Sequence, residues 1–159
     1  EIAGDDANYK MNPPLRSAAD VGALVDGLAD GTMEAISTDH APHAEEEKKQ
    51  SIAKAPFGIV GSETAYALSV THLVKTGKLT PLQLVEKMST NPCRILSVPG
   101  GTLSVGAPAD ITIADMDSEY VIDKNTFLSK GKNTPFDGAK VNGRVYYTIV
   151  GGNIVYQYE

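Results

Sequence analysis

The spacing of apolar residues changes at Pro99-Gly100-Gly101. Before this point, the apolar residues between Val21 and Leu28 recur at intervals of three and four, the period of one helical face. After it, the segment from Ala109 to Asp115 alternates apolar and polar residues, as a half-buried strand does. The pattern predicts an α/β part over residues 1–99 and a mostly β part over residues 100–159.

Capping signals delimit the first helix. Ser17, followed by Asp20 three residues later, is a variant of the capping box, and Gly31 is a typical stop signal. We expect a short strand over residues 34–37, directly after this helix. A second short strand is expected at Tyr9 to Met11, before the prolines that follow it.

The rest of the first part reads as helices. A helix is predicted over residues 62–75, with Gly77 closing it. Thr80 as cap and Pro81 at the first helical position predict another helix start, and Asn91-Pro92 repeats this device for a short helix through Leu96.

Two connections differ in length. The long one, from Ala41 to about Gly61, carries charged residues at 45–49 that predict a solvated loop. Loops of this length in compact domains are usually functional or disordered. The short one, Gly151-Gly152, joins two β-rich runs at residues 145–150 and 153–158 and predicts a hairpin.

The composition limits the class of protein. With 159 residues, 42% of them hydrophobic and 21% charged, the chain has the composition of a soluble globular protein. The formal net charge of −6 argues against a surface that follows nucleic-acid phosphates. No apolar run reaches the length of a membrane span, and Cys93 is the only cysteine. We expect a cytoplasmic protein without a nucleic-acid or membrane partner.

The run from Ser37 to His43 places one carboxylate and two imidazoles at the end of the strand predicted at 34–37. Asp39 either binds a divalent metal or acts as a general base there, or it caps the following turn. His43 is a candidate hydrogen-bond donor to an anionic substrate, whereas His40 could equally be a buried structural histidine. Asn12 precedes two prolines, which restrict its backbone to an extended form. Either its side-chain amide is thereby held in one direction, or Asn12 simply lies at the end of a strand. A zinc site needs about three protein ligands, which this run does not supply convincingly.

Several motifs together resemble one family. Residues 10–16 (KMNPPLR), 37–43 (STDHAPH) and 55–64 (APFGIVGSET) are similar to those of dihydroorotases, in the bacterial form related to the multifunctional pyrimidine enzyme of animals. Residues 106–111 (GAPADI) resemble the strand entry of the small β domain in the amidohydrolase superfamily. Residues 127–136 (FLSKGKNTPF) resemble a dihydroorotase signature near the carboxyl end.

The resemblance implies roles for individual residues. The motif aspartate matches Asp39, which would ligate zinc and carry a proton from the attacking water to the leaving amide nitrogen. The matching asparagine and histidine, Asn12 and His43, would contact the substrate. Phe57 and Gly58 match a pair that lines the substrate pocket, mainly through backbone groups. The histidine that matches His40 has no direct catalytic role in this interpretation.

The resemblance also implies a fold. Residues 1–99 would be the last β/α units of a TIM barrel that carry the catalytic Asp39, and residues 100–159 the C-terminal part of a composite β domain. The family's His-x-His strand, its bridging carboxylate and two further histidines have no counterpart here. One or two zinc ions would therefore need ligands from other polypeptide. We expect this chain to fold stably only with the remainder of the barrel, and to be inactive alone.

The implied activity is the reversible hydrolysis of the cyclic amide of dihydroorotate to N-carbamoyl-aspartate in de novo pyrimidine biosynthesis. The implied partners are this substrate pair, the N-terminal remainder of the enzyme and a second copy in a homo-oligomer. One alternative is another cyclic amidohydrolase of the allantoinase or dihydropyrimidinase type. Another is a non-catalytic, dihydroorotase-like scaffold for aspartate carbamoyltransferase.

Overall fold

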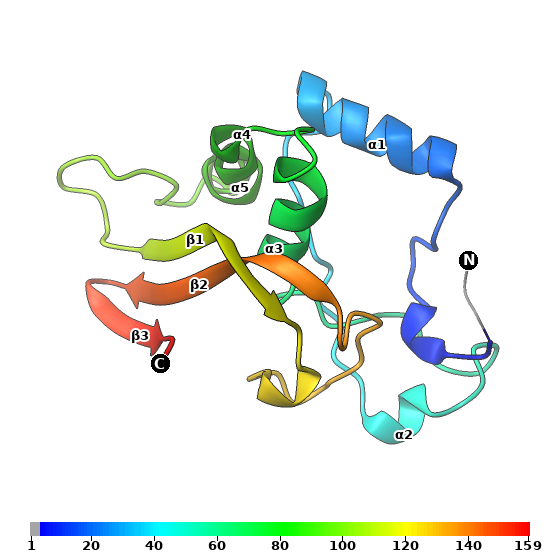
Figure 1. The fold of residues 1–159 in the computed structure, drawn as a ribbon. Coiled ribbons are helices and arrows are strands. Elements are labelled where there is room, and N and C mark those ends of the chain that lie inside the picture. Colours follow the sequence, from blue (N-terminus) through cyan, green and yellow to red (C-terminus); the bar gives the residue numbers. More distant parts are fainter. Residues whose placement is uncertain (1–3) are drawn as a thin grey trace.

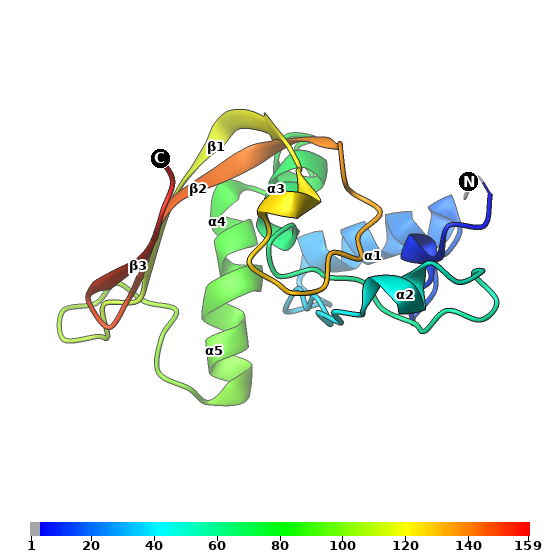
Figure 2. The same cartoon turned by 90° about the horizontal axis from the view of Figure 1, so that it is seen from below.

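The computed structural model describes residues 4–159, and it divides into a helical half and a small sheet (Figure 1). The sheet is antiparallel, in the order β1-β2-β3, and consists of β1 (Ile111–Val121), β2 (Lys140–Val150) and β3 (Asn153–Gln157). Helices pack on one side of it, and α2 and β3 lie on opposite sides of the molecule (Figure 2). This arrangement confirms an α/β protein, with the strands β1, β2 and β3 in its last third.

Within residues 4–159, the helical half contains five α-helices, and two π-helical segments follow α3 and α4. The α-helices are α1 (Ala18–Asp30), α2 (Glu45–Lys48), α3 (Ala65–Ser69), α4 (Pro81–Val85) and α5 (Asn91–Leu96). The π-helical segment η2 (Val70–Val74) continues α3, and η3 (Glu86–Thr90) joins α4 to α5. Two 3-10 turns complete the elements, η1 (Ala7–Tyr9) and η4 (Lys124–Thr126).

Local signals in the sequence located α1 and the β2–β3 hairpin correctly. Ser17 and Asp20 form the reciprocal capping box, and Gly31 ends the helix with a φ of 92°. In the hairpin, Gly151 and Gly152 have φ values of 54° and 80°, which a two-residue turn of this kind requires. Both predictions are confirmed because the interactions that decide them lie within a few residues.

The strand predicted at Tyr9 to Met11 is wrong. Residues Ala7–Tyr9 form the turn η1 instead, because the Asp6 side chain accepts a hydrogen bond from the Asn8 N–H at 2.8 Å and caps it. An Asx turn of this kind competes with extended backbone for the same N–H groups.

Residues 34–37 are extended, but within residues 4–159 they pair with no strand. Side chains and backbone of the α4–α5 helix take up their polar groups instead. Lys87 Nζ donates to the Met33 carbonyl at 2.6 Å, and the Ile36 N–H donates to the Lys87 carbonyl at 3.0 Å. Asn91 Nδ2 donates to the Glu34 carbonyl at 2.8 Å. The predicted strand is therefore an isolated extended segment, since a ladder needs a second strand beside it.

The two helices predicted at Thr80 and Asn91 are one continuous helix. The Asn91 N–H bonds to the Glu86 carbonyl five residues back, so the turn widens just before Pro92. A proline ring in a regular helix collides with the carbonyl four residues earlier, and the wider turn avoids this clash. Asn91 is consequently not a cap, and its side chain is free to hold residue Glu34.

The hydrophobic core is small and joins helix to sheet. Its centre consists of Ala67 on α3, Ile122 after β1 and Val141 on β2, with Phe127 and Phe136 packed against it. In contrast, α1 has no buried residue, and it stands apart from the sheet in Figure 1. Among the described residues, the apolar face predicted for α1 therefore has no covering layer.

Candidate functional site

The motif segments of the sequence lie side by side and are joined by backbone hydrogen bonds. The Ala41 N–H donates to the Ile59 carbonyl at 2.9 Å, and the Gly58 N–H donates to the Lys10 carbonyl at 3.0 Å. The Val60 N–H donates to the Asn133 carbonyl at 2.9 Å. Segments that are far apart in the sequence thus form one local structure around residues 41–43 and 57–60.

Asp39 lies at the end of the extended segment, with a φ of 45°. Aspartate and asparagine tolerate this left-handed conformation better than other residues with a Cβ atom. Its side chain is exposed, and within residues 4–159 its carboxylate accepts no hydrogen bond. Asp39 therefore does not act as the cap of a following turn in this structure, and both carboxylate oxygens are available.

His43 is held by protein groups at both ring nitrogens. Its Nε2 lies 2.9 Å from the Phe57 carbonyl, and its Nδ1 lies 3.5 Å from Glu47 Oε2. Because a carbonyl oxygen can only accept, Nε2 carries the proton. The imidazole thus joins the loop at residues 41–43 to the turn at Phe57-Gly58.

His40 has a structural contact. Its Nδ1 accepts hydrogen bonds from the Gly61 N–H at 3.1 Å and from the Ser62 N–H at 3.3 Å. The neutral ring then has its proton on Nε2. These contacts favour the structural alternative for His40 over a role in chemistry.

The Phe57-Gly58 turn requires its glycine. Gly58 has a φ of 125°, and a Cβ atom there would lie 2.5 Å from the Ala41 Cβ and 3.1 Å from His43 Nε2. Phe57 is 56% exposed, with Lys10 Nζ 4.7 Å from its ring centroid. The structure thus brings His43, Phe57 and Gly58 into contact.

Asn12 lies two residues after Lys10, whose backbone binds Gly58. Its side chain is exposed, and the peptide bond to Pro13 is cis. The described residues provide no hydrogen bond between the side chains of Asn12 and Asp39. These two residues lie on the same group of segments as His43, but no direct contact joins them.

Two buried polar residues of this region were missed by the sequence interpretation. Lys48 is only 7% exposed, although residues 45–49 were expected to be a solvated loop; this expectation is wrong for Lys48. Its Nζ donates to the carbonyls of Lys10, Pro56 and Gly58 at 3.3, 3.1 and 2.9 Å. Burial, followed by the neighbouring Lys10 charge, lowers the pKa of the Lys48 ammonium.

Asn133 is the second of these residues, and it is also buried. Its Oδ1 accepts from the His43 N–H at 2.9 Å, and its Nδ2 donates to the Ala41 carbonyl at 3.0 Å and the Gly58 carbonyl at 3.1 Å. The resemblance of residues 127–136 to a family signature was the only sign in the sequence that this segment mattered. Lys48 lies among the charged residues at 45–49, and nothing in that segment distinguished it from its exposed neighbours.

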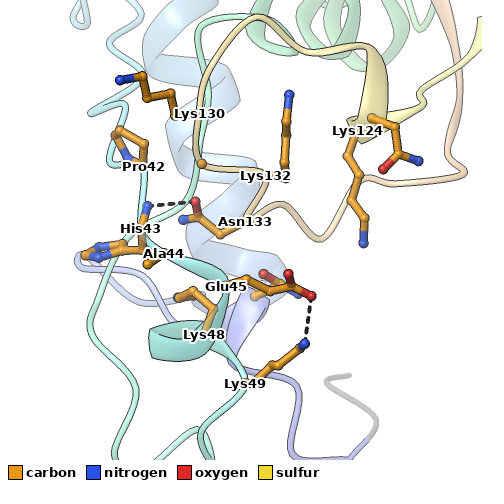
Figure 3. Close-up of a pocket in the computed structure, with 13 residues that line it drawn as sticks. Pro42, His43, Ala44, Glu45, Lys48, Lys49, Lys124, Lys130, Lys132 and Asn133 are labelled. Carbon is orange, nitrogen blue, oxygen red and sulfur yellow. Dashed lines mark hydrogen bonds and ion pairs between the residues drawn. The ribbon is translucent and has the colours of Figure 1, made fainter.

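A pocket of ≈ 760 Å³, to which mostly charged and polar residues contribute, opens beside these residues (Figure 3). Its walls come from α2, from the loop at residues 42–44 and from residues 130–133. Figure 3 shows Asn133 directed at the His43 backbone, while Lys49 pairs with Glu45 across 2.9 Å at the far side. The pocket thus borders the loop that carries His43.

The described residues do not make up a complete metal centre. Within residues 4–159, no group of three or more His, Cys, Asp or Glu side chains could hold a metal ion. The exposed Asp39 carboxylate fits the part of a single ligand, since both of its oxygens are unengaged. A zinc site that includes Asp39 would therefore need further ligands from outside residues 4–159.

The comparisons with known proteins identify the family. Residues 10–155 match the profile of the Amidohydrolase family, so the chain belongs to this family. It is 57% identical to the dihydroorotase of Bacillus licheniformis over 157 residues, and 54% identical to that of Bacillus subtilis over the same length. Each match covers 99% of this chain and 37% of the relative, so the chain spans about 37% of the length of these relatives.

Hydantoinases are among the solved structures that share this fold. The chain superposes on the L-hydantoinase (dihydropyrimidinase) of Arthrobacter aurescens with a TM-score of 0.88 and 34% identity, over 96% of this chain and 36% of that one. For a D-hydantoinase from Thermus sp. the TM-score is 0.85 and the identity 29%, over 95% and 34% of the two chains. No helix described here is long and apolar enough to cross a membrane.

Proposed function

We propose that this chain is part of a dihydroorotase, which hydrolyses the cyclic amide of dihydroorotate to N-carbamoyl-aspartate and runs the reverse reaction in de novo pyrimidine biosynthesis. One observation carries the proposal: the 57% identity with a dihydroorotase over 99% of the chain, a span that includes all three motif segments at residues 10–64. The hydrogen bonds that join these segments into one local structure support it.

We assign Asp39 the central role. Its exposed carboxylate, free of protein hydrogen bonds within residues 4–159, is available to bind metal and to move a proton from the attacking water to the leaving amide nitrogen. Asn12 and His43 would contact the substrate. Because the His43 ring binds the Phe57 carbonyl, His43 and the Phe57-Gly58 turn would act as one wall of the pocket.

Zinc, as one or two ions, is part of the proposal. Asp39 would supply one carboxylate ligand, and polypeptide outside this chain would supply the others. When bound, zinc polarises the substrate carbonyl and lowers the pKa of water. We further propose that residues 1–99 belong to a (β/α)8 barrel and residues 100–159 to a β domain, in a cytoplasmic homo-oligomer.

A second candidate is a dihydropyrimidinase-type enzyme, which the TM-score of 0.88 to a hydantoinase favours. Identity separates the two candidates, since it is 57% to a dihydroorotase and 34% to that hydantoinase. A third candidate, a non-catalytic partner of aspartate carbamoyltransferase, is opposed by the intact Asp39.

The test is an assay of the complete protein that contains this chain, loaded with zinc, on dihydroorotate, dihydrouracil, hydantoin and allantoin. We expect N-carbamoyl-aspartate to form from dihydroorotate with a kcat/KM at least about a hundredfold above that for the other substrates. A preference for hydantoin or dihydrouracil would replace the proposal with the second candidate. Absence of turnover on all four, in a folded protein, would favour the scaffold.

A further inference from the structure

Lys48 is a buried cation whose partners are backbone carbonyls. An ammonium group has three hydrogens to donate, and three carbonyl oxygens surround this one, at Lys10, Pro56 and Gly58. Within the described residues, no carboxylate lies in ion-pair distance of its Nζ. Burying a charge without a counter-ion destabilises the folded state. The three hydrogen bonds of Lys48 therefore indicate a role other than stabilising the fold.

Asn133 approaches the same place from a different part of the chain. The His43 N–H needs an acceptor and the carbonyls of Ala41 and Gly58 need donors, so only one orientation of the amide satisfies all three. This buried amide therefore joins the loop that carries His43 to the turn that carries Gly58.

The two side chains converge on one atom. The Gly58 carbonyl oxygen accepts from Lys48 Nζ at 2.9 Å and from Asn133 Nδ2 at 3.1 Å, which fills both of its lone pairs. The preceding carbonyl, that of Phe57, accepts a hydrogen bond from His43 Nε2 at 2.9 Å. The turn is thus held at two successive carbonyls.

We propose that Lys48 and Asn133 are positioning residues of the substrate pocket, which fix the Phe57-Gly58 turn against the loop that carries His43. This inference rests on the proposed function, because it takes these residues to form the pocket wall. Neither side chain needs to touch the substrate. Their role is to hold the backbone groups and the imidazole in the geometry that binds it.

The experiment is the Lys48→Met substitution in the complete protein, which removes the three donors and keeps a similar length. The matched control is Lys54→Met, because Lys54 is exposed and its side chain makes no hydrogen bond or ion pair with the described residues. We expect Lys48→Met to raise KM for dihydroorotate roughly tenfold or more, with kcat within about threefold of wild type. Lys54→Met should leave both values unchanged.

Amide hydrogen exchange provides a readout that does not depend on the substrate. In Lys48→Met we expect faster exchange at residues 56–60 and unchanged exchange in the β1–β2 pair, whose hydrogen bonds lie elsewhere. If Lys48→Met has the same KM as wild type and the same exchange at residues 56–60, the proposal is overturned. A uniform rise in exchange over the whole protein would overturn it as well. If the complete wild-type protein does not hydrolyse dihydroorotate, the proposed function fails, while the exchange comparison still decides the positioning role.

Asn133→Leu is the second variant, for the case that Lys48→Met does not fold. It removes both donors to Ala41 and Gly58 at similar volume, and the same change in KM and in exchange at residues 56–60 is expected. If neither variant folds, the two residues are general core residues, and the positioning role is overturned.

Discussion

At the scale of single residues, the backbone of Asp39 limits which substitutions are informative. Its φ of 45° lies in the left-handed region, where most residues with a Cβ atom are strained. Alanine at this position would change the backbone energy together with the carboxylate, so a loss of activity would have two causes. Asparagine tolerates the same conformation and has the same shape, so it isolates the contribution of the charge.

We therefore predict that Asp39→Asn in the complete protein lowers kcat for dihydroorotate by about a hundredfold or more, because the amide cannot accept the proton. In the metal-free protein, the free energy of unfolding should change by less than about 0.5 kcal/mol, because the Asp39 side chain is exposed and makes no hydrogen bond within residues 4–159. Steady-state kinetics and denaturant unfolding measure the two quantities. Turnover equal to that of wild type would remove Asp39 from the mechanism.

At the scale of elements, short-range signals predicted the first helix and the hairpin correctly, but they failed at the turn η1 and at residues 34–37. The Ser17 cap and the Gly151-Gly152 turn depend on neighbours within three residues, so the sequence was sufficient for them. The segment at 34–37 depends on Lys87 and Asn91, which are more than fifty residues away. No local pattern indicates that a helix, rather than a strand, satisfies its backbone groups.

The η4 turn gives a pH-dependent prediction at this scale. Asp137 accepts the Lys124 N–H at 3.0 Å, and this bond, with the Lys124 side chain, lowers the pKa of the Asp137 carboxyl. A lowered pKa in the folded state means that the stabilisation is present above the ordinary pKa of 3.8 and is lost as the pH falls through the folded value. The ionised carboxylate therefore stabilises the turn near neutral pH and not in acid.

Thermal unfolding of the complete protein between pH 6 and pH 3 tests this prediction. Wild type should unfold at a higher temperature than Asp137→Asn at pH 6, and the difference should shrink toward zero below about pH 4. Asp26→Asn, on the exposed surface of α1, serves as the control. A difference that stays constant down to pH 3 would contradict the assignment.

At the scale of the whole molecule, the surface is too large for a compact monomer. The accessible area is 10081 Å², whereas a folded protein of 16.8 kDa has roughly 7,700 Å² by the usual scaling with mass. Large apolar side chains contribute to the excess, including Leu103 at 81% and Leu128 at 84% exposure. Surfaces of this kind are normally covered by other polypeptide.

We therefore predict that the 159-residue chain alone self-associates or unfolds without a cooperative transition, whereas the complete protein unfolds cooperatively. Sedimentation of the isolated chain over a range of concentrations, together with thermal unfolding, measures both properties. An isolated chain that is monomeric and unfolds in one cooperative step would show that its small core suffices.

The sequence by itself determined the motif segments, the first helix and the hairpin, because each depends on nearby residues. It also determined which residues to propose for chemistry, through their resemblance to one family. The tertiary structure alone decided what Lys48 and Asn133 do. Their acceptors lie up to 92 residues away, and only the folded chain brings these carbonyls together around two buried donors.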